Sequence, residues 1–484
     1  MNRRNYTLHL ALAGALVVLA AAAGRIERWE VRREVAPRRV LTVAPPSTAE
    51  APAAEEREGE ERDDAEVLVR FKPGVSQERM EEIAASLNDR VEDRIESVEG
   101  LAAIDDLDDE EAARVAEEYA ALPEVEYAEP NFRIEAEPGA AGSFGYSGRS
   151  AATLPAGGPN DPLLGEQWGL VNTGQRNGRA SADISAFAAW DKTQGSRKVV
   201  VAVLDSGVDY THADLAGNMW HRPDDMEMYR DDDLGVIDDY DGFSAVESER
   251  DPMDENGHGT HCAGIVGAEG DNNLGIVGVN WYVEIMPLKF MGRGGFGSTK
   301  DAIAAINYVI ARKRDGVNVR VISASWGSQS RSKALEDVIR KAGEADILFV
   351  AAAGNDGADA DKRPHFPSGY KLPNVLSVAA LDRRDELARF SNYGAKGVHV
   401  AAPGHEILST WLGGKYEEHS GTSMATPFVA GVAGLVLSVE PNLSVKELRD
   451  RLMNTSDKLD SLKGKVVSGG RVNAARAVGA MQIK

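Results

Sequence analysis

The feature that most constrains this fold is a series of short, almost uninterrupted apolar runs that alternate with helix-like segments from Asn160 onward. The runs cover Val199–Leu204, Val283–Leu288, Val319–Ala324, Ile347–Ala352, Val375–Ala380 and Val398–Ala401, and the helical segments cover His258–Ala268, Thr299–Arg312, Lys333–Ala345 and Thr422–Ser438. Strands that are apolar throughout are buried on both faces, as in a parallel sheet covered by helices. The sequence therefore predicts an α/β fold with a mainly parallel central sheet. A last helix is expected after Ser444, which has capping-box spacing to Glu447.

Three segments carry the residues of a serine triad. Asp205 follows the run Val199–Leu204, and ligands of parallel sheets bind beyond the carboxyl ends of the strands. His258 and Ser423 each follow a glycine-containing loop and open a helical segment rich in Ala, Val and Gly. Asp, then His, then Ser is one of the known chain orders of a serine triad. The sequence therefore predicts a serine hydrolase.

The segments around these residues carry a family resemblance. His258–Ile265, Val350–Asn355 and Gly421–Pro427 resemble the subtilase (subtilisin-like) serine endopeptidases, and the first is most similar to the thermitase and proteinase K branch. The resemblance covers roughly residues 160–478 and implies the subtilisin-like three-layer fold. The preceding domain resembles the inhibitory propeptide of the same family.

The resemblance implies a role for each catalytic residue. Ser423 is the expected nucleophile, His258 its general base, and Asp205 the group that holds the imidazole in one tautomer. The Asn355 amide and the backbone N–H of Ser423 are expected to stabilise the oxyanion that forms on attack. The implied enzyme is an endopeptidase of broad specificity, with a preference for large hydrophobic residues before the scissile bond.

The resemblance also implies a substrate cleft made largely of backbone. Two segments are expected to pair with an extended polypeptide from opposite sides, and a third to wall the pocket for the residue before the scissile bond. The first contains Gly295, Phe296 and Gly297, the second Ser325, Trp326 and Gly327, and the third Ala352, Ala353 and Gly354. His365-Phe-Pro367 would form the base of the pocket, with Pro367 cis. Packing is the alternative role for Trp326 and Phe296.

Calcium is the cofactor that the resemblance implies. The segment Glu269–Gly278 resembles the strong calcium loop of the family, and six oxygen ligands suit calcium. The implied ligands are side-chain oxygens of Asp161, Asp214 and Asn272 and carbonyl oxygens of Glu269, Leu274 and Ile276. The acidic segment Asp231–Asp254 is either a second site or a solvated loop, and Ser244 stands where thermitase's second site has a carboxylate.

Changes in composition divide the chain into five parts. We predict a signal peptide at 1–24, a disordered acidic spacer at 25–65, a ferredoxin-like α+β propeptide domain at 66–135, a flexible linker at 136–159 and the peptidase domain at 160–484. An uncleaved membrane anchor is the alternative for the first part. The propeptide is expected to inhibit its own peptidase domain, and self-cleavage is expected within Glu135–Pro159.

Charge and cysteine content limit the partners. The net charge of −23 argues against nucleic acid, which binds basic surfaces. The signal segment predicts a secreted protein that is free of the membrane once the signal is removed, and a monomer is expected. The single cysteine, Cys262, excludes an internal disulfide. It lies one helical turn after His258, where a buried small side chain is expected; a bulky mercurial on it would displace His258.

Other chemistries fit the same motifs less well. Asp205-Ser-Gly could be half of an aspartic-protease dyad, but no second such motif follows a comparable strand. His258 and His261 lack the acidic residue of a zinc metalloprotease, so a structural His261 is expected. Gly421-Thr-Ser-Met-Ala425 lacks the second glycine of the α/β-hydrolase elbow. Two alternatives stay open, namely an inactive subtilase-fold binding protein and a processing protease of narrow specificity.

Overall fold

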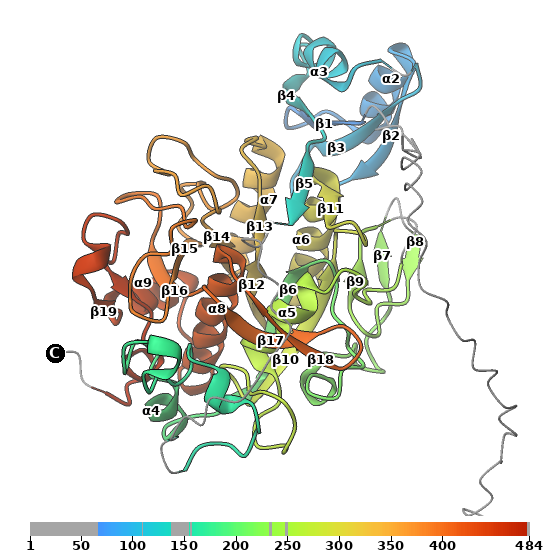
Figure 1. Cartoon of the computed structure of the whole chain (residues 1–484). Helices are drawn as coiled ribbons and strands as arrows, with labels where there is room; N and C mark the ends of the chain where they lie inside the picture. The colour runs from blue at the N-terminus through green and yellow to red at the C-terminus, as the bar shows by residue number, and fades with distance from the viewer. Residues whose placement is uncertain are drawn as a thin grey trace, which may run out of the picture. The chain divides into compact units, whose positions relative to one another are not determined.

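The computed structural model describes residues 66–108, 110–136, 154, 157–231, 235–246 and 250–481, all within the compact unit Arg62–Lys484 (Figure 1). The predicted signal peptide and spacer, and nearly all of the predicted linker, lie outside these residues.

The central sheet of the C-terminal part has the strand order β19-β20-β16-β15-β14-β12-β6-β10-β9. Every pair in it is parallel except β19 with β20. Its strands are β6 (Gly195–Asp205), β9 (Phe243–Ser244), β10 (Tyr282–Lys289), β12 (Val319–Ala324), β14 (Leu348–Ala352), β15 (Val375–Leu381), β16 (Val400–Pro403), β19 (Asp457–Lys458) and β20 (Gly470–Arg471). The six predicted apolar runs each coincide with one of these strands, which confirms the α/β class.

Helices cover both faces of this sheet, as Figure 1 shows. Alternate residues of β6 point to opposite faces: Val199, Val201 and Val203 pack with α5 (His258–Gly267) and α8 (Thr422–Val439), whereas Val200, Ala202 and Leu204 pack with α6 (Thr299–Arg314) and α7 (Lys333–Glu344). Among the described helices, only α8 is long and apolar enough to cross a membrane. Because 89% of α8 is buried in the protein, it is a core helix.

The remaining elements are short. The helices are α4 (Ala186–Trp190), α9 (Val445–Asn454) and α10 (Ala474–Ala477), and the strands are β7 (Tyr229–Asp231), β8 (Gly235–Ile237), β11 (Phe296–Ser298), β13 (Trp326–Gly327), β17 (Ile407–Trp411) and β18 (Lys415–His419). Ser444 caps α9 through the predicted capping box with Glu447. Sequence analysis did not predict the hairpin of β17 and β18, because it is stabilised by contact with α5 and lacks a long apolar run.

The N-terminal domain has the predicted β-α-β-β-α-β order. It consists of β1 (Glu66–Phe71), α2 (Gln77–Ser86), β2 (Asp89–Arg94), β3 (Leu101–Asp106), α3 (Ala112–Ala120) and β4 (Val125–Pro130). The sheet order β2-β3-β1-β4, with all pairs antiparallel, is that of a ferredoxin-like domain. Val67 and Val69 of β1 face α2 and α3 on one side of this sheet.

The other side of this sheet packs against the C-terminal domain. Leu68, Leu101 and Ala103 share one apolar cluster with residues of α6 and α7. After β4 the chain continues as β5 (Arg133–Ala136), which pairs with β11 and β13 of the C-terminal domain. The two domains are therefore joined by apolar contact and by a shared antiparallel sheet.

The N-terminal domain also supplies acceptors for the starts of two helices. Glu129 accepts hydrogen bonds from the Ser332 hydroxyl and from the N–H groups of Lys333 and Ala334, at the start of α7, at 2.6–3.0 Å. The Asn131 side chain and the Phe132 carbonyl accept from the N–H groups of Lys300 and Thr299, at the start of α6, both at 2.9 Å. Helix starts carry N–H groups without intrahelical partners, so these contacts stabilise both helices.

Replacement of Glu129 tests this cap. In the full chain carrying Ser423→Ala, Glu129→Ala should lower the free energy of unfolding by about 1–2 kcal/mol, the usual cost of losing a helix cap. Urea denaturation followed by tryptophan fluorescence measures the change. Glu117→Ala, on the exposed side of α3, is the charge-matched control. Equal midpoints for the two variants would contradict the capping role.

Candidate active site

Asp205 and His258 form a hydrogen-bonded pair at the carboxyl end of β6. Asp205 is the last residue of the strand and is fully buried. Its Oδ1 lies 2.7 Å from His258 Nδ1 and accepts the backbone N–H of Ser206 at 2.8 Å. A buried carboxylate needs such donors, because leaving it unpaired in the interior is costly. The bond to Nδ1 leaves Nε2 as the nitrogen that can accept a proton from a nucleophile.

Two glycines allow α5 to approach β6 so closely. Gly257 precedes the helix with φ 104°, a left-handed conformation that favours glycine. A Cβ on Gly259 would lie 2.0 Å from the Gly207 carbonyl oxygen. The Gly-His-Gly sequence is therefore what brings the first residue of α5 against the end of β6.

Ser423 lies in the first turn of α8 and is fully buried. Its hydroxyl donates to the Ser325 carbonyl at 3.0 Å, and the Ser325 hydroxyl donates to the Ser423 carbonyl at 2.9 Å. The thiol of Cys262 lies 3.6 Å from the same Ser423 carbonyl. Its sulfur also lies within 4.8 Å of a carboxylate oxygen of Asp205 and of a ring nitrogen of His258. Ser423 thus lies beside the Asp205–His258 pair, with its hydroxyl turned to Ser325 and not in the expected bond to His258.

Asn355 follows β14, and its side chain is bonded to Thr422, the residue before Ser423. The Asn355 Oδ1 accepts from the backbone N–H of Thr422 at 2.9 Å and from its hydroxyl at 3.1 Å. The Nδ2 group is buried and has no acceptor among the described residues. A Cβ on Gly421 would lie 3.5 Å from this Nδ2. The amide is therefore fixed through its oxygen, and its N–H donors stay available.

The expected flanking segments hold a strand between them. β5 pairs antiparallel with β11 (Gly297 with Ile134) and with β13 (Gly327 with Glu135), and the Ala136 N–H donates to the Gly295 carbonyl at 2.8 Å. A chain segment of this protein thus occupies the position expected for an extended polypeptide.

The two aromatic residues of these segments differ in exposure. Trp326 is fully buried and donates through Nε1 to the Leu204 carbonyl at 2.9 Å, so its side chain is a packing residue. Phe296 is 41% exposed, and the Arg133 guanidinium lies 3.9 Å from its ring centre. The Phe296 ring thus contacts Arg133 of β5.

The expected pocket wall and base lie together. Ala352, Ala353 and Gly354 are buried at the end of β14. Cβ atoms added to Gly327 and Gly354 would lie 2.0 Å and 3.0 Å from the His365 ring, so the imidazole fills the space between the two glycines. The Phe366–Pro367 peptide is cis.

Comparison with known proteins gives the family. The model described as "Subtilase family" matches residues 196–476, more than half of the chain. The chain belongs to the subtilase family. A second model, the "Fervidolysin N-terminal prodomain", matches residues 48–131. This subtilase is therefore a subtilisin-like serine endopeptidase with a prodomain ahead of its peptidase domain.

Its relatives differ greatly in length. Thermitase of Thermoactinomyces vulgaris is 35% identical over 321 residues, 66% of this chain and 99% of thermitase. The thermophilic serine proteinase of Bacillus sp. (strain AK1) is 36% identical over 357 residues, 74% of this chain and 73% of that protein. Subtilisin-like protease 2 of Plasmodium falciparum (isolate 3D7) is 37% identical over 305 residues, 61% of this chain and only 22% of that longer protein.

The structure brings together the three side chains expected to bind calcium. Asp214 is fully buried and accepts from Asn272 Nδ2 at 2.8 Å, from the Ile276 N–H at 2.9 Å and from the Tyr416 hydroxyl at 3.0 Å. Burial and the charge of Asp214 raise the pKa of Asp161 to about 6. Asp161 Oδ1 is buried without a hydrogen-bond partner among the described residues. This unmet oxygen beside a second carboxylate fits a divalent cation. Sequence analysis did not identify Tyr416, because this residue comes from the distant β18.

The same loop is bonded to the segment that begins at Asn160. The Asp271 carboxylate accepts the Asn160 N–H at 3.2 Å, and Asp161 accepts the Asp271 N–H at 2.9 Å. The Asn160 side chain accepts the Asn273 N–H at 2.6 Å, and the Leu163 N–H donates to the Gly275 carbonyl at 2.8 Å. Residues 160–163 are thus tied to loop 271–275 by backbone and side-chain bonds.

Several carboxylates of the acidic segment Asp231–Asp254 have partners within the protein. Asp239 is fully buried and pairs with Arg312 at 2.6 Å and with Arg222 at 3.0 Å. Asp254 accepts N–H and hydroxyl donors at the start of α5. Ser244 is buried, and its hydroxyl accepts the Val246 N–H. These contacts give the segment a structural role, and its residues 232–234 and 247–249 lie outside the described residues.

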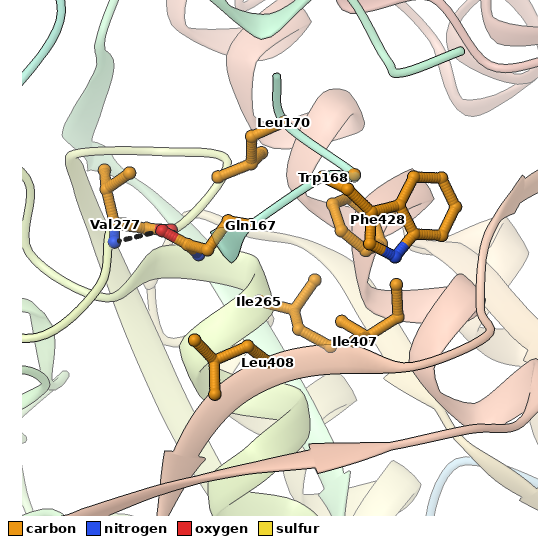
Figure 2. A pocket seen from close by; sticks show the side chains of 9 residues that line it. Gln167, Trp168, Leu170, Ile265, Val277, Ile407, Leu408 and Phe428 are labelled. Atoms are coloured by element: carbon orange, nitrogen blue, oxygen red, sulfur yellow. Dashed lines mark hydrogen bonds between the residues drawn. The ribbon is translucent and has the colours of Figure 1, made fainter. Parts of the chain in front are cut away.

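Three other features near α5 are structural or too small to hold a ligand. Within the described part of the chain, Asp205, His258 and Cys262 form the only group of three or more acidic, His or Cys side chains close enough to share a metal, and there His258 Nδ1 is already bonded to Asp205. His261 Nε2 lies 3.1 Å from the Ile407 carbonyl and 3.0 Å from that of Glu417, which suits a structural histidine. Figure 2 shows the mainly apolar side chains around a cavity beside α5 and α8, where Gln167 accepts the Val277 N–H. The volume of this cavity is about 10 Å³, which leaves room for one water at most.

The buried thiol allows a test of this geometry. Burial, and secondarily the charge of Asp205, raise the pKa of Cys262 well above its usual value, so the thiol stays protonated at neutral pH. Only the thiolate reacts with iodoacetamide. We expect no alkylation of the native protein up to pH 8, and rapid alkylation in urea, as read by mass spectrometry. Similar rates in both conditions would contradict the burial of Cys262.

Proposed function

We propose that this subtilase hydrolyses peptide bonds through an acyl-enzyme formed on Ser423, with His258 as general base and Asp205 as its orienting carboxylate. The observation that carries the proposal is the 2.7 Å bond between Asp205 and His258 Nδ1, beside Ser423 and the available amide of Asn355. In this pair the carboxylate fixes the imidazole tautomer and stabilises the imidazolium that forms during attack.

The nucleophile reaches its base by rotation of one side chain. Ser423 donates to the Ser325 carbonyl in the present arrangement, in which β5 occupies the cleft. In the proposed mechanism the Ser423 hydroxyl turns from Ser325 toward His258, which then accepts its proton as the oxygen attacks the substrate carbonyl. His258 returns this proton to the leaving amine, and water repeats the sequence on the acyl-enzyme.

The oxyanion is stabilised by donors that are already in position. Asn355 has both bonds to its oxygen satisfied by Thr422, so its Nδ2 need not reorganise when charge develops. The backbone N–H of Ser423, in the first turn of α8, is the second donor, near the positive end of the helix dipole.

The substrate is proposed to bind as β5 does. Pairing with both β11 and β13 depends on backbone groups, which makes binding tolerant of sequence. The pocket walled by Ala352, Ala353 and Gly354 is apolar, so large hydrophobic residues before the scissile bond are favoured. His365 at its base is the residue that sets how deep such a side chain reaches.

The prodomain is proposed to inhibit the enzyme by occupying the cleft and to be removed by self-cleavage within Glu135–Pro159. Only Glu135, Ala136 and a few positions near the end of that stretch lie within the described residues. Export follows from the predicted signal peptide at 1–24, and one relative is named a "halolysin-like extracellular serine protease". A secreted monomer that acts on polypeptides is the resulting proposal.

Two substitutions separate chemistry from binding. Ser423→Ala should abolish hydrolysis of a peptide p-nitroanilide, whereas Asn355→Ala should lower kcat by about 10²–10³-fold with little change in KM. The second value corresponds to about 2.7–4 kcal/mol, the cost of losing one oxyanion donor in subtilisin. The exposed Asn318→Ala is the matched control for the amide. Full activity of Ser423→Ala would refute the mechanism.

The rival proposal is a binding protein that only retains the fold. A fluorophosphonate probe distinguishes the two, because it labels an activated serine. Labelling of the matured protein that is lost on heating and in Ser423→Ala supports the peptidase, and no labelling favours the rival. A narrow processing protease would cleave one partner but leave casein intact.

Calcium is proposed to bind at Asp161, Asp214 and Asn272 with the carbonyls of Glu269, Leu274 and Ile276. When bound, it would neutralise the two buried carboxylates and tie residues 160–163 to loop 271–275. In the uncut Ser423→Ala chain, calcium at 100 times its Kd should add about 2.7 kcal/mol of stability, and a chelator should remove it. Thermal unfolding measures this. Asp161→Ala should abolish the calcium response, and the exposed Asp191→Ala should keep it; the same response in both would refute the site.

A further inference from the structure

Asp254 is a buried carboxylate that the proposed mechanism does not use. It lies in the loop before α5 and is only 4% exposed. Its Oδ1 accepts from the Ser206 hydroxyl and from the N–H groups of Asn256 and Gly257, each at 2.9 Å, and its Oδ2 accepts from the Thr260 N–H at 2.9 Å and the Thr260 hydroxyl at 2.6 Å. Because both oxygens accept from donors, these bonds favour the ionised form, although burial raises the pKa of Asp254.

These bonds fasten the start of α5. Gly257 precedes the helix and has no side chain that could cap it. The Asp254 carboxylate takes the N–H groups of Gly257 and Thr260 instead, and its negative charge suits the positive end of the helix. Because His258 is the first residue of α5, the position of its imidazole depends on this cap.

Ser206 connects the same carboxylate to Asp205. The Ser206 hydroxyl donates to Asp254 and accepts the Gly259 N–H at 3.0 Å, while the Ser206 N–H donates to Asp205 Oδ1 at 2.8 Å. The same Asp205 Oδ1 lies 2.7 Å from His258 Nδ1. The hydrogen bonds therefore close a ring through Asp254, Ser206, Asp205, His258 and the first turn of α5.

We propose that Asp254 is a positioning residue for the Asp205–His258 pair, because it clamps Ser206 and the first turn of α5 together and so fixes the imidazole before substrate binds. This inference rests on the proposed peptidase function and adds a residue that does not touch the substrate. The charge of Asp254 also reaches the pair. The pKa of Cys262 is raised mainly by burial and by the charge of Asp205, and the charge of Asp254 raises it further. The Cys262 sulfur lies within 4.8 Å of a carboxylate oxygen of Asp205 and a ring nitrogen of His258.

Asp254→Asn, expressed as the full chain and assayed after maturation, tests the clamp, because an amide places an N–H₂ group against existing donors. We expect kcat on a peptide p-nitroanilide to fall roughly 100-fold, with KM within about threefold, since a displacement of about 1 Å can cost that much. The acid limb of kcat/KM should move to lower pH, because losing a negative charge near His258 destabilises the imidazolium. Values are normalised to folded protein by near-UV circular dichroism.

Asp183→Asn is the matched control. Asp183 is also a buried carboxylate, and it accepts the N–H groups of Asn172 at 2.7 Å and Ser185 at 2.8 Å, two donors that lie outside β6 and α5. The same substitution there should lower the melting temperature but leave kcat per folded protein and the acid limb unchanged. A purely structural role for Asp254 would make the two variants behave alike, and that outcome would overturn the proposal.

Ser206→Ala keeps the proposal testable if Asp254→Asn fails to mature. It removes only the bridging hydroxyl, so we expect a roughly 10-fold lower kcat, and a double variant no worse than Asp254→Asn alone, because interacting residues are not additive. Wild-type kcat and acid limb in Ser206→Ala, or in Asp254→Asn, would overturn the clamp. If the clamp fails in this way but Ser423→Ala is inactive, the proposed peptidase function still stands. If Ser423→Ala is active, the proposed function itself is overturned.

Discussion

The hydrogen bond between Asp205 and His258 is the contact on which the site depends, because it joins the central sheet to the helices that cover it. β6 is paired on both sides, by β10 and β12, so Asp205 cannot shift without disturbing the sheet. α5 is held against the end of β6 by the close approach of Gly259 to Gly207. α8 runs through the core and presents Ser423 from the same side. The relative position of the three side chains is thus set by main-chain packing and not by flexible loops.

The sequence predicted the parts of the structure that local patterns determine. The apolar runs became strands within a few residues of the expected ends, because only burial on both faces accommodates such runs. It could not predict the Ser423 hydroxyl turned to Ser325 or the Tyr416 hydroxyl on Asp214, and it left the role of Trp326 open between packing and substrate binding, since each depends on a contact between distant segments. Asp254 was expected only as part of an acidic loop that was either solvated or calcium-binding. Its role at α5 becomes visible only when Ser206 and the helix start are brought together.

The prodomain and the peptidase domain share elements in a way that links folding to inhibition. β5 completes an antiparallel sheet with β11 and β13, and the residues just before it cap α6 and α7. β5, which fills the cleft, is therefore continuous with residues 129–132, which stabilise the starts of α6 and α7. Leu68 and Leu101 extend this contact through the apolar cluster they share with those helices. Blocking the cleft and supporting the fold are consequences of one interface.

The ties between residues 160–163 and loop 271–275 have a consequence for evolution of the connecting segment. Residues 160–163 are held by bonds to Asp271, Asn273 and Gly275. These bonds resist any displacement that comes from the chain before Asn160. The catalytic centre is thereby mechanically isolated from the stretch that joins the two domains. We therefore expect insertions or deletions in that stretch to leave turnover by the matured enzyme nearly unchanged.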